Sequence, residues 1–182
     1  MLTRTELGID SSDFAVLAVG DITVNKNHRV LVEAMAILPR NFKLFIAGDG
    51  PQRGELESLA SRLGVSDRVT LLGFRSDIPA LLNACDLFCF PSKREGLPVS
   101  LLEAMASGAP VMSSDARGCA DVLGDSARIL VSRNCSPEVW AQGIASFALS
   151  KSAVDTSFSS RKLDFFSIQS TKTKLASIYR SI

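Results

Sequence analysis

LFCFPSKREGLPVSLLEAMASGAPV, residues 87–111, holds a strand, a turn, a helix and the start of a second strand, and the fold can be predicted outward from it. Leu87–Phe90 is apolar throughout, as expected for a parallel strand that is covered on both faces. Pro91 ends this strand, and Gly96 permits the tight turn that follows. Pro98 suits the first turn of the next helix, because the N–H that proline lacks has no partner there in any case.

The helix after this turn is expected to end at Gly108 and Pro110. Two carboxylates mark the unit, Glu95 in the turn and Glu103 eight residues later inside the helix. The apolar stripe that would face the core is expected to comprise Leu101, Leu102, Met105 and Ala106.

Apolar runs alternate with helical patterns along the rest of the chain, which predicts a doubly wound α/β domain with a mostly parallel sheet of about six strands. The expected strands are residues 14–20, 43–48, 69–73, 87–90, 111–112 and 127–131, and residues 113–118 are expected to form a loop. The expected helices are residues 29–38, 52–63, a segment capped by Asp77 that ends at Ala84, 98–108, a segment that starts at Ser136-Pro137 and buries Trp140, and a terminal helix over 165–182.

Charge and composition exclude several classes of function. The chain has 20 Lys and Arg against 19 Asp and Glu, and this balance gives no reason to expect a nucleic-acid partner. No apolar run approaches the ~18–20 residues of a membrane span. The four cysteines show no metal-binding spacing, so buried reduced thiols in a cytoplasmic protein are expected.

The turn before the 98–108 helix is the expected ligand site. In an open α/β sheet, ligands lie beyond the carboxyl ends of the strands, where helix N-termini attract anions. The free N–H groups of Leu97, Val99 and Ser100 would suit a phosphate, whereas Glu95 and Glu103 would accept hydrogen bonds from hydroxyls. Sugar and ribose hydroxyls are the obvious donors.

The sequence motif in this stretch resembles that of a known family. Pro-Ser-x-x-Glu-Gly-Leu-Pro-x-x-x-x-Glu-Ala-Met-Ala-x-Gly-x-Pro-Val is similar to the donor-site signature of family 4 retaining glycosyltransferases, and most like polysaccharide-biosynthesis members. These enzymes have the GT-B fold, two Rossmann-like domains that face each other across a cleft. The resemblance covers roughly Phe14 to Tyr179 and implies the C-terminal, donor-binding half. On this division residues 1–13 are a linker remnant, 14–150 the nucleotide-sugar-binding domain, and 151–182 a polar loop and a helix that packs back on it.

The resemblance also implies roles for individual residues. Glu95 would bind hydroxyls of the donor sugar, Glu103 the ribose, and Lys26 the diphosphate, with Glu95 and Lys26 as the catalytic pair. The further donor-binding residues that it implies are Gly20, Gly96, Leu97 and Val99, with Phe74 and Arg75 at the base.

The chain departs from the family pattern after the first strand. Family members often place an arginine directly after the glycine that matches Gly20, as a second cation for the diphosphate, whereas this chain has Asp21. An acid there predicts weaker diphosphate binding, and Arg75 is an alternative source of the missing cation. Arg117 and Gly118 either line the site or form a surface turn.

The lone histidine, His28, is interpreted as a contact in the first turn of a helix, with catalysis as the less favoured alternative. The sequence has no Ser-His-Asp arrangement, no Walker lysine motif and no metal cluster, and Gly48-x-Gly50 is only a fragment of a dinucleotide fingerprint.

The function implied by the resemblance is transfer of a sugar from a nucleotide-diphosphate-sugar to a hydroxyl acceptor with retained configuration, in cell-surface polysaccharide or glycolipid assembly. No cofactor and no metal are expected. An N-terminal GT-B half, in the full-length protein or as a separate chain, is expected to supply the acceptor site, without which this chain is expected to be inactive. A lipid-linked acceptor would bring the protein to the inner face of the membrane. The alternatives are a non-catalytic nucleotide-binding module and part of a GT-B nucleotide-sugar epimerase; the base, the sugar, the acceptor and the oligomeric state stay open.

Overall fold

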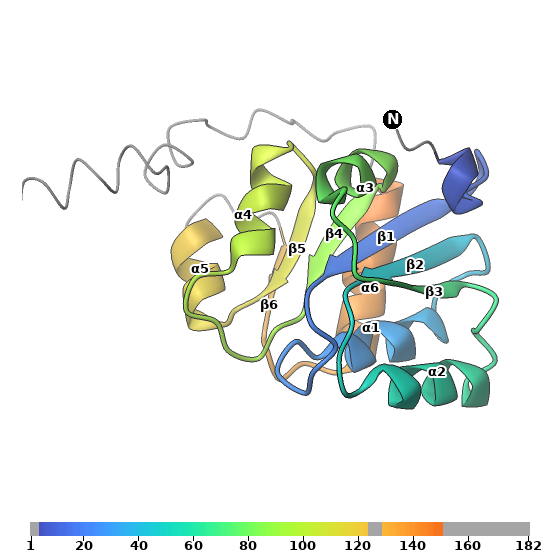
Figure 1. The fold of residues 1–182 in the computed structure, drawn as a ribbon, viewed down its shortest axis with the longest axis horizontal. Coiled ribbons are helices and arrows are strands. Elements are labelled where there is room, and N and C mark those ends of the chain that lie inside the picture. The colour runs from blue at the N-terminus through green and yellow to red at the C-terminus, as the bar shows by residue number, and fades with distance from the viewer. Residues whose placement is uncertain (1–3, 124–128, 151–182) are drawn as a thin grey trace, which may run out of the picture.

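A computed structural model describes residues 4–123 and 129–150 and confirms the doubly wound α/β architecture (Figure 1). Six strands form one sheet in the order β3-β2-β1-β4-β5-β6, and every neighbouring pair is parallel. The strands are β1 Phe14–Val19, β2 Phe42–Ala47, β3 Val69–Gly73, β4 Leu87–Phe90, β5 Val111–Ser114 and β6 Ile129–Val131.

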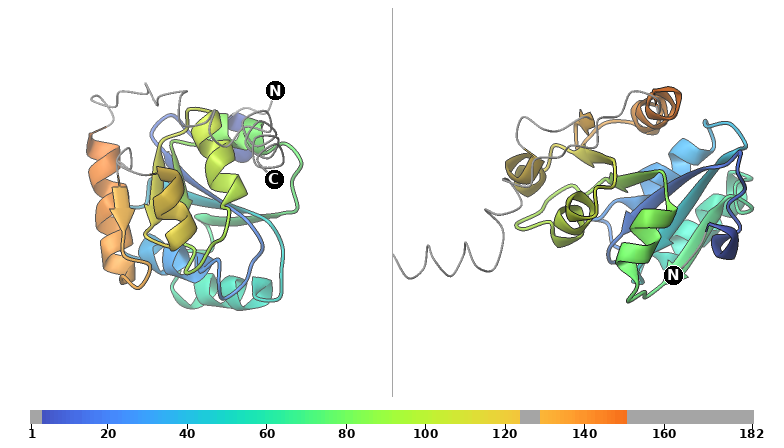
Figure 2. Two further views of the ribbon diagram at one scale, coloured as in Figure 1. Left: turned by 90° about the vertical axis from the view of Figure 1, so that its left-hand side faces the viewer. Right: turned by 90° about the horizontal axis from the view of Figure 1, so that it is seen from above.

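Helices cover both faces of this sheet, as Figure 2 shows in its view from above. Helices α1, α2 and α6 share one apolar cluster with the sheet, and α3, α4 and α5 share the other. The helices are α1 His28–Met35, α2 Arg53–Arg62, α3 Ile78–Ala84, α4 Val99–Ala106, α5 Arg117–Leu123 and α6 Pro137–Leu149.

The two clusters explain why the strands are apolar at successive positions. In β1, Phe14, Val16 and Ala18 pack toward α1, α2 and α6, whereas Ala15 and Leu17 pack toward α3, α4 and α5. Side chains alternate between the faces of a sheet, so a strand that is covered on both faces needs apolar residues at every position. Trp140 of α6 is 2% exposed, which confirms it as a core residue.

Three local predictions around β5, α5 and α4 were wrong. Strand β5 continues through Ser113 and Ser114, where a loop was expected, because both hydroxyls find backbone acceptors: Ser113 Oγ donates to Phe90 O at 3.5 Å, and Ser114 Oγ donates to Ser92 O. Residues Arg117 to Leu123 then form α5, which is too short to show a clear helical period. In α4 the buried stripe is Leu101, Ala104 and Met105, whereas Ala106 is exposed, because the helix turns its small Ala104 toward the sheet.

Asp77 precedes α3 as expected, but its side chain makes no capping hydrogen bond. The carboxylate binds Arg75 instead, at 2.7 and 2.6 Å. Two parallel hydrogen bonds from a guanidinium, with opposite charges on the two partners, are stronger than one hydrogen bond from a helix N–H to the same carboxylate, which accounts for the difference.

Residues 4–13, expected to be a linker remnant, are held against the domain. They include a 3-10 helix, Thr5–Leu7, and Ile9, which is buried in the core. Arg4 Nη1 donates to Asp86 Oδ2 at 2.9 Å and to Ala84 O at 3.0 Å. The expected C-terminal helix over 165–182 lies outside the described residues. Across residues 4–123 and 129–150, no helix combines the length and apolar character that crossing a bilayer requires.

Candidate functional site

Lys26 and Glu95 meet at the carboxyl edge of the sheet. Lys26 lies in the loop after β1 and Glu95 in the loop after β4, and these two strands are neighbours where the strand order reverses. The Lys26 ammonium is 2.8 Å from Glu95 Oε1 and 4.9 Å from the centroid of the Phe90 ring. Their side chains are only 22% and 10% exposed, so each charge lies mostly out of water and next to its partner. This switch point is where ligands bind in open α/β sheets.

The Lys26 loop is shaped by close backbone approaches. Gly20 directly follows β1, and a Cβ on it would stand 3.3 Å from the Cε atom of Lys26. Gly48, at the end of β2, has φ +148°, and a Cβ there would lie 2.1 Å from Gly20 O. Only glycine fits at position 48, since a side chain would displace the loop that carries Lys26.

The Glu95 loop is tied to the Lys26 loop by hydrogen bonds. Asn25 O accepts from the Lys93 N–H at 2.8 Å, and Asn25 Nδ2 donates to Arg94 O at 2.8 Å. Asn27, the one non-glycine residue with positive φ in residues 4–123 and 129–150, points its amide at Pro91 O at 3.4 Å. The two loops therefore form one unit around the ion pair.

The first turn of α4 lies beside this ion pair and supplies backbone donors. Pro98 precedes the helix and gives no side-chain cap, so the first N–H groups of α4 have no intrahelical partner. Gly96, Leu97 and Val99 are all exposed here. Glu103 is exposed one turn further along, and the four-residue spacing puts it on the same helix face as Val99. The turn thus presents a partial positive charge, flanked by two carboxylates.

Phe74 and Arg75 lie after β3, on the same edge but beyond β2 and β1. Phe74 is 87% exposed, which leaves its ring open to solvent. Arg75 is bound to Asp77, and this hydrogen-bonded pair raises the pKa of Arg75 and lowers the pKa of Asp77. The arginine proposed as a substitute cation therefore already has an anionic partner. Asp21 is exposed.

Three residues of the site were missed or left open by the sequence. Asn25 carries no motif signal, because its role depends on a loop 69 residues away. Gly118 lies in the first turn of α5, and a Cβ on it would stand 2.4 Å from Gly96 O and 2.9 Å from Glu95 O. Gly118 therefore packs directly against the Glu95 turn. Of the two alternatives, it lies beside the predicted site and not in a surface turn. Arg117, its neighbour, is exposed.

His28 is the first residue of α1 and is 2% exposed, which agrees with the interpretation as a first-turn contact. Its Nδ1 atom has no hydrogen-bond partner among the residues that the structure describes. Burial, together with the charge of Lys26, lowers the pKa of His28 to about 4, so the imidazole is neutral at physiological pH.

The thiols and potential metal ligands add little to the site. All four cysteines are free, and burial raises the pKa of Cys119 to about 11. Among residues 4–123 and 129–150, no three His, Cys, Asp or Glu side chains lie together in a way that could hold a metal ion.

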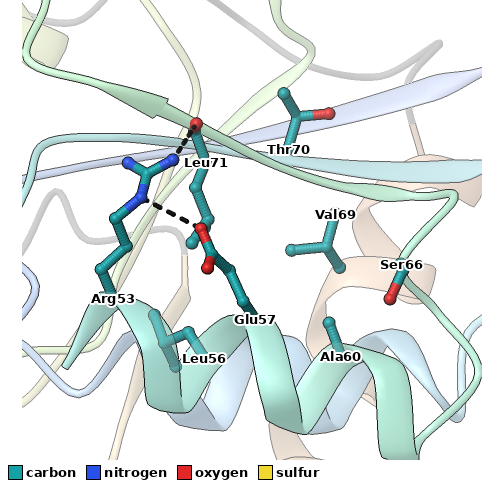
Figure 3. Close-up of a pocket in the computed structure, with 8 residues that line it drawn as sticks. All are labelled: Arg53, Leu56, Glu57, Ala60, Ser66, Val69, Thr70 and Leu71. Atoms are coloured by element: carbon teal, nitrogen blue, oxygen red, sulfur yellow. Dashed lines mark hydrogen bonds and ion pairs between the residues drawn. The ribbon is translucent and has the colours of Figure 1, made fainter.

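A surface hollow of about 390 Å³ lies between α2 and the edge strand β3, away from the Lys26–Glu95 pair (Figure 3). Its rim carries Arg53, whose guanidinium donates to Glu57 Oε1 at 3.0 Å and to Leu71 O at 3.2 Å. The arginine thereby covers a carbonyl of an edge strand, which limits pairing with another chain. None of the residues predicted to form the donor site lines this hollow.

Comparisons with known proteins agree with this picture. A family model described as glycosyl transferases group 1 matches residues 2–161. The 2-deoxystreptamine glucosyltransferase of Streptomyces kanamyceticus is 38% identical over 111 residues, which cover 58% of this chain and 29% of that protein. The lipopolysaccharide core biosynthesis glycosyltransferase LpsE of Rhizobium meliloti is 36% identical over 115 residues, covering 63% of this chain and 34% of that protein.

Among solved structures, Anabaena HepE in complex with UDP and glucose superposes with a TM-score of 0.87 at 26% identity. The match covers 98% of this chain and 51% of HepE. The chain thus spans about half of this structural neighbour and about a third of the curated relatives.

Proposed function

Because this chain belongs to the group 1 glycosyl transferases, we propose that it is the donor-binding half of a retaining glycosyltransferase with the GT-B fold. The reaction would move a sugar from a nucleotide-diphosphate-sugar to a hydroxyl acceptor. The observation that carries the proposal is the Lys26–Glu95 pair, which lies at the switch point of the sheet and beside the free N-terminus of α4.

The arrangement suits departure of a diphosphate. Charge accumulates on the diphosphate as its bond to the sugar breaks, and preorganised positive groups stabilise that charge most in the transition state. Lys26 has three N–H donors, so it can keep one bond to Glu95 and direct another at a phosphate oxygen. The N-terminus of α4 adds its free backbone N–H groups.

The carboxylates suit the hydroxyls of the same donor. Glu95 Oε1 is held by Lys26, which leaves Oε2 to accept a hydrogen bond from the sugar. Glu103, on the exposed face of α4, would accept from the ribose. Gly96, Leu97 and Val99 would contribute backbone contacts, and the exposed ring of Phe74, with Arg75, would meet the base. No metal or cofactor takes part in this scheme.

The donor to test first is a UDP-sugar, because HepE, the neighbour with a TM-score of 0.87, is seen with UDP and glucose. The acceptor class follows relatives such as LpsE, so we propose polysaccharide or glycolipid assembly, in the cytoplasm at the inner face of the membrane. The second half of the GT-B fold would supply the acceptor wall, and this chain alone would bind the donor without transferring the sugar.

The experiment is a melting curve of the 182-residue chain with UDP, GDP or ADP, beside a transfer assay with UDP-glucose. A dissociation constant of roughly 0.5 mM and ligand at about 5 mM give a stabilisation of about 1.4 kcal/mol. For a domain of this size the melting temperature would rise by roughly 3–6 °C. No shift with any nucleotide would contradict the donor site, and transfer by this chain alone would contradict the half-enzyme proposal.

A further inference from the structure

Glu95 lies in a segment without regular structure, so neither a helix nor the sheet fixes it. The chain from Pro91 to Pro98 runs between β4 and α4, and its residues belong to no strand and no helix. A carboxylate that must meet a sugar hydroxyl has to be held within about 0.5 Å of its working position. Something else must therefore hold the peptide units on either side of Glu95.

On the side before Glu95, the holding residue is Asn25. Its backbone carbonyl accepts from the Lys93 N–H, and its side-chain amide donates to Arg94 O, both at 2.8 Å. Only the second bond is lost in Asn25→Ala. The Arg94 carbonyl belongs to the peptide bond that leads into Glu95. Since Asn25 immediately precedes Lys26, this contact also sets the distance between the two members of the ion pair.

On the side after Glu95, the holding residue is Gly118. Its Cα faces the carbonyl oxygens of both Glu95 and Gly96 so closely that a Cβ would stand 2.9 and 2.4 Å away. Contacts of this kind do not occur below 3.0 Å, so an alanine would force the Gly96 carbonyl and the first turn of α5 apart by at least about 0.6 Å. That displacement exceeds the tolerance of a positioned carboxylate.

We propose that Asn25 and Gly118 are positioning residues that hold Glu95 between the loop of Lys26 and helix α5, and so determine how well the site accepts the sugar of its donor. This inference rests on the proposed function, because it takes Glu95 to contact the sugar. Neither residue touches the donor; each acts through the backbone beside Glu95. Their loss should therefore affect the sugar and spare the nucleotide.

The test uses Asn25→Ala and Gly118→Ala with two matched controls. Asn41→Ala removes a comparable amide-to-carbonyl bond, from Asn41 Nδ2 to Ser12 O at 3.2 Å, outside the site. Gly54→Ala adds a Cβ to a helical glycine that has nothing within 4 Å. Calorimetry then compares UDP with UDP-glucose for all four variants.

We expect Asn25→Ala and Gly118→Ala to raise the dissociation constant of UDP-glucose at least about fivefold while changing that of UDP less than about twofold. The controls should change neither. Equal losses on both ligands, or no loss on either, would overturn the proposal.

Crystal structures of the two variants without ligand give a readout that does not depend on the donor. We expect the Lys26–Glu95 separation, 2.8 Å in the parent chain, to lengthen by at least about 0.5 Å in both variants. An unchanged separation in both variants would overturn the proposal. A parent chain that binds neither UDP nor UDP-glucose would contradict the proposed function instead, and this second measurement would still decide whether Asn25 and Gly118 position Glu95.

Discussion

Lys26 Nζ and Glu95 Oε1 are 2.8 Å apart although the two residues are 69 positions apart in the chain. Parallel strands β1 and β4 bring them together, since each residue lies in the loop that follows one of these neighbouring strands. A mostly buried carboxylate without a partner would be costly, so the lysine also makes Glu95 tolerable as a charged group. The pair therefore links the stability of the site to its chemistry.

The coupling free energy between Lys26 and Glu95 can be measured without any ligand. Lys26→Met and Glu95→Gln, singly and together, form a double-mutant cycle in urea unfolding, and we expect a coupling of about 1–2 kcal/mol for a contact of this burial. The cycle for Arg40 and Asp67, whose side chains are 84% and 59% exposed at 3.4 Å, is the control and should give less than about 0.5 kcal/mol. Equal couplings in both cycles would show that burial does not strengthen the pair.

The charge of Lys26 should also matter for phosphate. Lys26→Ala removes the ammonium, so the affinity for UDP should fall by about 1–2 kcal/mol while binding of uridine stays the same. Calorimetry on both ligands makes the comparison. An equal loss on uridine would mean that Lys26 acts only by holding the loop.

Glu103 should contribute to UDP affinity by accepting a hydrogen bond from the ribose. Glu103→Gln replaces a charge-assisted hydrogen bond by a neutral one, and we expect UDP binding to weaken by about 1–2 kcal/mol. Glu138→Gln on α6, also an exposed glutamate in a helix, is the matched control and should leave binding unchanged. Identical affinities of parent and Glu103→Gln would remove the residue from the site.

The sequence predicted the parts of the fold that depend on local pattern. The apolar runs located all six strands, and the two residues predicted to act together, Lys26 and Glu95, do lie in contact at the carboxyl edge of the sheet. It did not predict Asn25 and left Gly118 open between the site and a surface turn, because their positions depend on contacts with a loop that is distant in the chain. Helix α5 was missed for a related reason, since its seven residues are too few to show periodicity and it is stabilised by packing.

Gly48 packs closely against the backbone of Gly20, so substitution of Gly48 should destabilise the chain. In Gly48→Ala the new Cβ would stand 2.1 Å from Gly20 O at a φ of +148°, so we expect a loss of about 2–4 kcal/mol in unfolding free energy. Gly54→Ala, in an open helical position, should be neutral or stabilising by up to about 1 kcal/mol. Urea unfolding of both variants makes the comparison, and a Gly48→Ala protein as stable as the parent would show that the loop can move away freely.

His28 should make the chain less stable in acid. Its pKa is about 4 in the folded chain against 6.5 for an ordinary histidine, chiefly because burial disfavours the imidazolium and secondarily because Lys26 repels it. Between these two values the unfolded chain binds more protons than the folded one, so stability rises with pH across that window and falls as the pH drops below 6.5. At pH 5 the loss relative to pH 7 should be about 2 kcal/mol.

His28→Gln removes this titration, so the stability of the parent minus that of the variant should decrease by about 2 kcal/mol from pH 7 to pH 5, while the carboxylates that titrate in both proteins cancel. The chain has one histidine, so its imidazole can be titrated by NMR without assignment. Lys26→Met should raise the measured pKa of His28, because it removes the repelling charge. A pKa near 6.5 in the folded parent would contradict the burial argument, and a constant difference in stability between pH 7 and pH 5 would do the same, because both would mean that the imidazole accepts its proton without leaving the core.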